Sequence, residues 1–144
     1  IWGSNYKSKL NRLVILQKKV IRIITKSPFL SHTHNLFKQE KLLNINQIHT
    51  LEISIFMFKL YNNRLPNSFN NLFKLNKDVH NHNKRQSKNF HAISKQTKLG
   101  QFSISSTGPK IWNMFNLSDN DSKTVEHFKR HMKNILLEND NGRT

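Results

Sequence analysis

The chain has 144 residues, about the length of one domain, and its 24 Lys and Arg against 8 Asp and Glu give a formal net charge of +16 at pH 7. It has no cysteine, which excludes disulfides, thiolate nucleophiles and cysteine-containing zinc fingers. So large a positive charge repels itself unless a polyanion neutralises it, so we expect nucleic acid as the partner, with an anionic membrane surface as the alternative.

The first predicted element is an amphipathic helix over residues 5–26. Apolar residues recur there at helical spacing, and the basic residues Arg12, Lys19, Arg22 and Lys26 fall on the opposite side. Pro28 ends this helix, because proline restricts the residue before it and cannot continue the hydrogen-bond ladder. The chain begins with Ile rather than Met, so we expect it to be a segment of a longer protein.

The middle of the chain is predicted to hold a short helix followed by a core helix. Thr33 or Asn35 can cap the short helix, which runs to about residue 43, and Asn46 can cap an apolar helix over residues 47–63. The second helix is apolar on nearly every side, so its neighbours must cover it all round. Its apolar run is shorter than the roughly 20 residues of a membrane span and carries charged residues, so we expect a buried helix and no membrane partner.

The last part of the chain is predicted to begin with a long basic loop over residues 76–100, with at most a short strand at 90–93. Residues 101–105 alternate weakly like a strand, which leaves room for one short β-hairpin. Pro109 suits the first position of a following helix, and a last helix should begin near Asp121 or Ser122.

These elements predict a mainly α fold, a small helical domain with a long basic loop. We treat residues 1–144 as a single domain. It comprises a helical part (1–75), the basic loop (76–100), and a strand or turn with the C-terminal helices (101–144).

The acidic residues are too few and too scattered to predict a catalytic centre. Polymerases and nucleases hold metal ions with converging carboxylates, and Asp119 and Asp121 are a close pair in this sequence. This pair directly precedes a predicted helix, where aspartate serves as a cap. The chain also lacks a glycine-rich phosphate loop and a recognisable catalytic triad, so we expect no activity from this segment alone and no cofactor.

The histidines suggest a metal site only weakly. His80 and His82 lie in the predicted loop, and His127 and His131 are four residues apart, hence on one helical face. The helical pair lacks a glutamate at the position that a zinc protease motif requires. We therefore expect no metal site and interpret the histidines as solvated or as neighbours of phosphates.

The distribution of charge is the strongest functional signal. Residues 1–39 contain eight Lys or Arg and no acid, and residues 79–118 contain six and no acid. In the second zone, lysines alternate with Phe90, His91 and Phe102, a mixture suited to phosphate contact and base stacking, although it also fits an ordinary solvated loop. The candidate nucleic-acid-binding residues are Arg12, Lys19, Arg22, Lys26, Lys84, Arg85, Lys88, Lys95, Lys98 and Lys110.

Several short patterns also occur in a fixed order along the chain. They include Trp2-Gly3, Arg22-Ile23-Ile24, Asn63-Arg64-Leu65-Pro66, Lys84-Arg85-Gln86, Gly100-Gln101-Phe102 and Gly108-Pro109-Lys110-Ile111-Trp112-Asn113. Together they resemble the C-terminal region of Jockey-like non-LTR retrotransposon reverse transcriptases, beyond the polymerase palm. The resemblance covers nearly the whole chain, and the last pattern is the most specific. The chain departs from the family at Lys84, where Thr is usual, and at Met114-Phe115, where Leu-Pro is usual.

The resemblance implies a parent protein that is an RNA-directed DNA polymerase of a mobile element, acting by target-primed reverse transcription in nucleus and cytoplasm. This segment lacks the Tyr/Phe-x-Asp-Asp signature, so it does not hold the polymerase centre. From its charge we expect it to hold template RNA or target DNA, with RNA, DNA and the rest of the polypeptide as partners. The alternative is a structural or interaction buttress of the polymerase with no nucleic-acid role.

Overall fold

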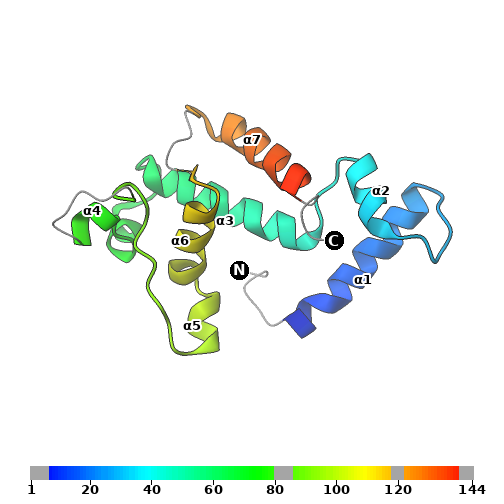
Figure 1. Cartoon of the computed structure of the whole chain (residues 1–144), viewed down its shortest axis with the longest axis horizontal. Helices are drawn as coiled ribbons and strands as arrows, with labels where there is room; N and C mark the ends of the chain where they lie inside the picture. Colours follow the sequence, from blue (N-terminus) through cyan, green and yellow to red (C-terminus); the bar gives the residue numbers. More distant parts are fainter. Residues whose placement is uncertain (1–6, 80–85, 118–121, 140–144) are drawn as a thin grey trace. The chain divides into compact units, whose positions relative to one another are not determined.

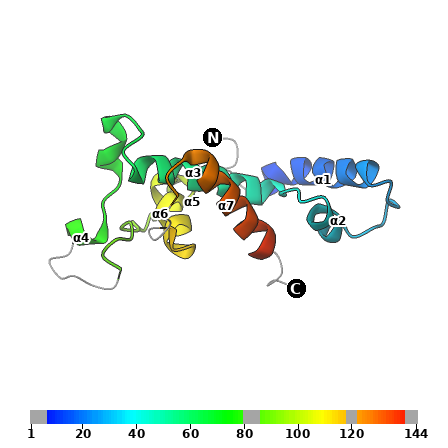
Figure 2. The same ribbon diagram turned by 90° about the horizontal axis from the view of Figure 1, so that it is seen from above.

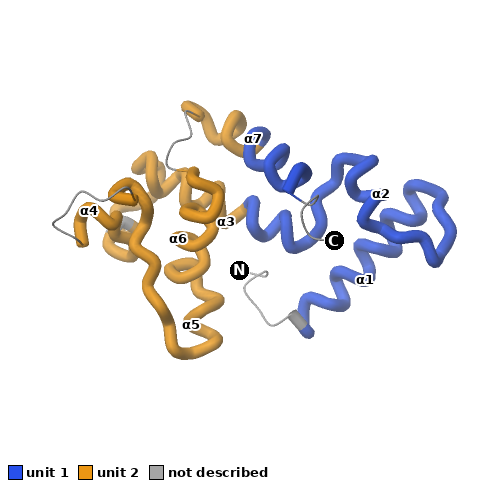
Figure 3. Tube along the Cα trace, in the orientation of Figure 1, with its two compact units in different colours: residues 1–51, 130–144 blue, residues 52–129 orange. Residues whose placement is uncertain are grey.

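The computed structural model describes residues 7–79, 86–117 and 122–139. They are mainly helical, as expected (Figure 1). The elements in chain order are α1 (Lys7–Ile24), α2 (Thr33–Gln39), α3 (Ile45–Tyr61), a 3-10 helix (Asn67–Leu72), α4 (Asn76–Val79), α5 (Lys98–Phe102), α6 (Ile104–Met114) and α7 (Val125–Glu138). The chain divides into two compact units, residues 1–51 with 130–144, and residues 52–129 (Figure 3).

The first unit is organised by α1, with α2 folded back beside it (Figures 1 and 2). Ile21 of α1 and Phe37 of α2 are buried in this unit. Two hydrogen bonds close the end of α1, from Ser27 N–H to the Arg22 carbonyl and from Lys26 N–H to the Ile23 carbonyl. Lys26 has a positive φ of 50°, which identifies a left-handed helix terminus. The helix thus ends at Ile24, two residues before the predicted end.

The side chain of Gln17 ties α1 to the start of α3. Its amide nitrogen donates to the Leu43 carbonyl over 3.0 Å, and its amide oxygen accepts from the Ile45 N–H over 2.9 Å. The Ile45 N–H belongs to the first turn of α3, whose donors have no partner within the helix. A residue of α1 therefore satisfies a backbone donor of α3.

The cap of α3 is Asn44, so the prediction that Asn46 caps this helix is wrong. The Asn44 side-chain oxygen accepts from the N–H groups of Asn46 and Gln47, and the Gln47 side chain accepts from the Asn44 N–H over 2.8 Å. This is a reciprocal capping box. Gln47 also donates to the Leu136 carbonyl of α7 over 2.8 Å, which fastens α7 to the same end of α3.

The second unit has an aromatic core that covers the rest of α3. Phe58 of α3 stacks on Phe128 of α7 with ring centroids 4.3 Å apart. Trp112 of α6 is 1% exposed and lies against Tyr61, 5.2 Å away, and Phe90, 5.7 Å away. The prediction of a buried apolar helix is confirmed, and Trp112 is part of the core that covers it. Truncating such a buried aromatic typically costs about 3–5 kcal/mol.

The predicted strand over residues 101–105 is wrong, because this segment holds the end of α5 and the start of α6, with Ser103 as the extended residue between the two helices. The Thr97 hydroxyl caps α5 by accepting a hydrogen bond from the Gly100 N–H. This cap favours a helix, whereas the alternation of apolar and polar residues over 101–105 is too short to establish the period of a strand. Pro109 lies inside α6, which begins at Ile104, and so does not start the helix. At residues 90–93 a single bridge pairs Phe90 with Leu75, and no strand forms among the described residues there.

The last helix, α7, begins at Val125, a few residues after the predicted start. The hydroxyl of Thr124 accepts from the His127 N–H over 3.2 Å, so Thr124 is the cap. Ser122 precedes the helix and is buried, and its hydroxyl lies 2.9 Å from Nδ1 of His127. Asp119 and Asp121, the predicted capping pair, lie outside the described residues.

Candidate nucleic-acid interface

The exposed cations of α1 are the core of the candidate interface. Arg12 and Lys19 are seven residues apart, or about two helical turns, so they lie on one line of the helix. Lys18, which sequence analysis did not select, is also exposed on the polar side. The acid-free zone over residues 1–39 includes Lys18, so the signal for it was present in the sequence. These three cations can neutralise phosphates without competition from acids nearby in sequence.

Arg22, another predicted site residue, is held by the protein itself. Its Nε donates to the Ser31 carbonyl over 3.1 Å, and its Nη1 contacts the Lys18 carbonyl over 3.5 Å. The guanidinium carbon lies 5.8 Å from the centroid of the Phe29 ring, a cation–π geometry. Arg22 therefore shapes the loop after α1 rather than extending freely into solvent.

Phe29 is the aromatic residue of this region that sequence analysis missed. Its side chain is 73% exposed, at the tip of the loop between α1 and α2. Lys26, a predicted site residue, is exposed in the turn just before it. An exposed aromatic ring beside cations is the combination that proteins use to stack the bases of single-stranded nucleic acid. The sequence signal for this residue was an aromatic side chain directly after Pro28, the proline that follows the helix.

A polar cleft of about 270 Å³ lies close to this basic face, within the first unit. Its polar lining includes Lys18 of α1, His34 of α2, and Asn44 and Asn46 at the start of α3. Ammonium, imidazole and amide groups can bind phosphate oxygens or the edges of bases. The cleft therefore suits the same class of ligand as the exposed cations.

The second basic zone contributes exposed lysines from the other compact unit. Lys88 is exposed in a turn, Lys98 on α5 and Lys110 on α6, whereas Lys95 is half-buried with its stem close to Gly100. Lys84 and Arg85, the other predicted site residues of this zone, lie outside the described residues.

Phe90 was expected to stack on bases together with His91 and Phe102, and the structure contradicts this. Its side chain is 5% exposed and packs edge-on against Trp112. The ring is thus part of the core and does not extend from the surface as a platform for bases. The burial depends on Trp112 and Asn113 of α6, more than 20 residues later, so the local sequence carried no signal for it.

The pattern Gly108-Pro109-Lys110-Ile111-Trp112-Asn113 serves the packing of the second unit. A Cβ at Gly108 would lie 2.6 Å from the sulfur of Met57, which is fully buried, so glycine allows α6 to approach α3 closely. Trp112 fills the core, and the Asn113 side chain holds the backbone of Phe90 by two hydrogen bonds. Lys110 is the member of the pattern that faces solvent.

Among the residues that the structure describes, no three His, Asp or Glu side chains come together as metal ligands. His80 and His82 lie outside those residues. Burial lowers the pKa of His49 in α3 below its usual value, which favours the neutral imidazole. No helix in the described part of the chain is long and apolar enough to cross a membrane.

Comparisons with models of known protein families, with curated proteins and with solved structures found no match. The chemistry of the site is therefore what indicates its function. It comprises exposed cations on α1, the exposed ring of Phe29 in the loop after this helix, and a cleft whose lining includes Lys18.

Proposed function

We propose that this chain is a non-catalytic nucleic-acid-binding segment that holds RNA or DNA through α1 and the loop after it. The observation that carries the proposal is the set of exposed cations Arg12, Lys18 and Lys19 on α1, in a zone without any acid, together with the exposed ring of Phe29, which lies against Arg22 in the loop after the helix. Cations supply sequence-independent affinity for the phosphate backbone, and the ring offers a surface for a base.

The residues divide this work between them. Arg12, Lys18 and Lys19 contact phosphates, and Phe29 stacks on an unpaired base. Arg22 acts as a positioning residue, because its bond to the Ser31 carbonyl and its place over the Phe29 ring hold the loop in shape. This arrangement favours single-stranded regions, whose bases are free to stack on an aromatic ring.

We further propose that the parent protein is a reverse transcriptase of a non-LTR retrotransposon, in which this C-terminal segment holds template RNA or target DNA. The support is the ordered set of sequence patterns together with the high positive charge. The competing role is a structural buttress of the polymerase, which needs no affinity for nucleic acid.

The proposal is tested by titrating the chain into labelled single-stranded RNA, single-stranded DNA and duplex DNA of about 20 nucleotides at several salt concentrations. The triple variant Arg12→Gln, Lys18→Gln, Lys19→Gln should bind more weakly. Its salt slope should fall by about 0.7 per lost contact on single strands. The matched control is Lys74→Gln, Lys77→Gln, Lys129→Gln, which removes the same charge from exposed positions of the second unit.

Three outcomes separate the hypotheses. A larger loss in the α1 variant than in the control supports the interface on α1. Equal losses indicate attraction to net charge alone and overturn the site. Binding by the parent chain that is weak and independent of salt favours the buttress.

A further inference from the structure

One face of α1 is a row of aliphatic side chains that the described structure leaves uncovered. Leu13, Leu16, Val20 and Ile24 follow one another at intervals of three or four residues, and Ile23 lies beside them. Their side chains are between 43% and 76% exposed. Ile21, one line further round the helix, is 1% exposed and packs into the first unit. Only the edge of the apolar face that contains Ile21 therefore packs within the first unit.

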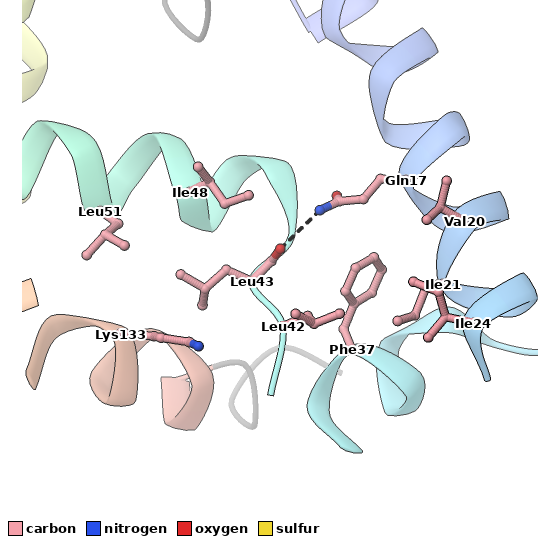
Figure 4. A pocket seen from close by; sticks show the side chains of 10 residues that line it. All are labelled: Gln17, Val20, Ile21, Ile24, Phe37, Leu42, Leu43, Ile48, Leu51 and Lys133. Atoms are coloured by element: carbon pink, nitrogen blue, oxygen red, sulfur yellow. Dashed lines mark hydrogen bonds between the residues drawn. The ribbon is translucent and has the colours of Figure 1, made fainter. Parts of the chain in front are cut away.

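This row continues into an apolar groove of about 420 Å³ (Figure 4). Val20 and Ile24 belong to both features, with Phe37 and Leu42 across the groove from α1. Ile48 and Leu51 of α3 extend the lining, and Lys133 of α7 is its charged member. We call the row and the groove together the α1 apolar surface.

The charged residues of α1 that border the apolar surface are positive. Lys9 lies one turn before Leu13 on the same side of the helix, and Arg12 and Lys19 lie along the edge next to Ile23. Lys133 adds a positive charge at the groove. No acidic residue occurs in residues 1–39 to offset these cations. The surface is therefore complementary to an apolar ligand with acidic borders.

Three other occupants fit this surface less well. Aliphatic side chains offer no planar ring on which a base could stack, so a nucleic acid would leave the row exposed. A second copy of the chain would bring the same positive border against itself. A bilayer is flat on this scale, whereas the groove is lined by residues of α1, α2, α3 and α7 and suits the ridge of another helix.

We propose that the α1 apolar surface binds an amphipathic helix of a partner protein, one whose apolar stripe is bordered by Asp and Glu. The stripe of the partner packs along Leu13, Leu16, Val20 and Ile24, and one of its side chains enters the groove. The acidic borders of the partner pair with Lys9, Arg12, Lys19 and Lys133. Arg12 and Lys19 belong to both proposed sites, whereas the aliphatic row belongs to this one alone, so changes in the row test protein binding independently of nucleic-acid binding.

The test uses three labelled synthetic peptides of about 20 residues, titrated with the full chain and followed by fluorescence anisotropy. The first has leucines at helical spacing bordered by glutamates, the second has lysine borders, and the third has the first peptide's composition with scrambled leucines. The binding variant is Leu16→Gln, Ile23→Gln. The control is Leu72→Gln, Leu99→Gln, at exposed positions of the second unit.

We expect the glutamate-bordered peptide to bind best, and Leu16→Gln, Ile23→Gln to weaken it by about tenfold or more, while the control stays near the parent. The binding variant should keep the RNA affinity and the circular dichroism spectrum of the parent, because it changes exposed side chains and no charge. Equal binding of ordered and scrambled peptides would show charge attraction alone and overturn the proposal. The proposal would also be overturned if Leu16→Gln, Ile23→Gln lowered self-association of the chain, or its binding to anionic phospholipid vesicles, without changing peptide binding.

Discussion

The Asn113 side chain of α6 pairs with both backbone polar groups of Phe90. Its amide oxygen accepts from the Phe90 N–H over 3.1 Å, and its amide nitrogen donates to the Phe90 carbonyl over 2.8 Å. One amide side chain thus takes the place of a neighbouring strand. It fixes the basic loop at the point where the Phe90 ring enters the core.

Replacing Asn113 with Ala should therefore destabilise the second unit. Two partly buried backbone groups lose their partner, and each such loss costs about 1–3 kcal/mol. The free energy of unfolding, measured in urea, should fall accordingly, and protease cleavage in residues 86–97 should become faster. The matched control is Asn134→Ala, at an exposed position of α7, where alanine favours the helix slightly. Unchanged stability in Asn113→Ala would show that the two hydrogen bonds to Phe90 contribute nothing to the free energy of unfolding.

The contrast between α3 and Phe90 shows what the sequence could predict. The apolar residues of α3 surround the helix, so both its helical form and its burial could be read locally. Phe90 stands in a polar stretch, and its burial depends on Asn113 and Trp112, which come more than 20 residues later. Contacts at that separation leave no periodic signal in the chain.

The same limit applies to α1 and the interface. Amphipathic spacing predicted the helix and its basic side, but a helical pattern cannot tell which apolar residues the fold will cover. Ile21 is buried, whereas Leu16 and Ile23 are exposed. The role of Phe29 could not be predicted for a similar reason. Its place beside Arg22 depends on the hydrogen bond from Arg22 to the Ser31 carbonyl, which fixes the loop.

Lys41, at the end of α2, should be more favourable as glycine. It has a positive φ of 51°, and hydrogen bonds from Lys41 and Leu42 close the helix end around it. A side chain in this left-handed conformation costs roughly 1–2 kcal/mol. Glycine avoids this cost, but it loses more conformational freedom on folding, which offsets part of the gain. We expect Lys41→Gly to raise the unfolding free energy by about 0.5–1 kcal/mol. Lys41→Ala removes the same charge but keeps the strain, so it should not show this gain.

His49 should make stability depend on pH. Burial lowers its pKa in the folded state, so between the folded and unfolded pKa values the unfolded chain binds more protons. The free energy of unfolding should therefore fall as the pH decreases through the usual histidine pKa of about 6.5, until the pH passes the lowered value. His49→Gln should lose less stability than the parent between about pH 7.5 and pH 5. Parallel curves for the two proteins would exclude His49 as the cause.

Phe29 and the exposed cations of α1 should affect nucleic-acid binding in different ways. Stacking of a base on an aromatic ring contributes about 1–3 kcal/mol and involves no counterion, so Phe29→Ala should weaken single-strand binding about 5- to 150-fold without changing the salt slope. Losses at Arg12, Lys18 and Lys19 should change the slope instead. Duplex binding should respond little to Phe29→Ala, because paired bases are already stacked on their neighbours. The adjacent Leu30 is 87% exposed and serves as the control, since Leu30→Ala removes apolar surface but no ring. Equal effects of the two variants would mean that the loop contributes apolar contact rather than stacking, and Phe29 would then have no special role in binding.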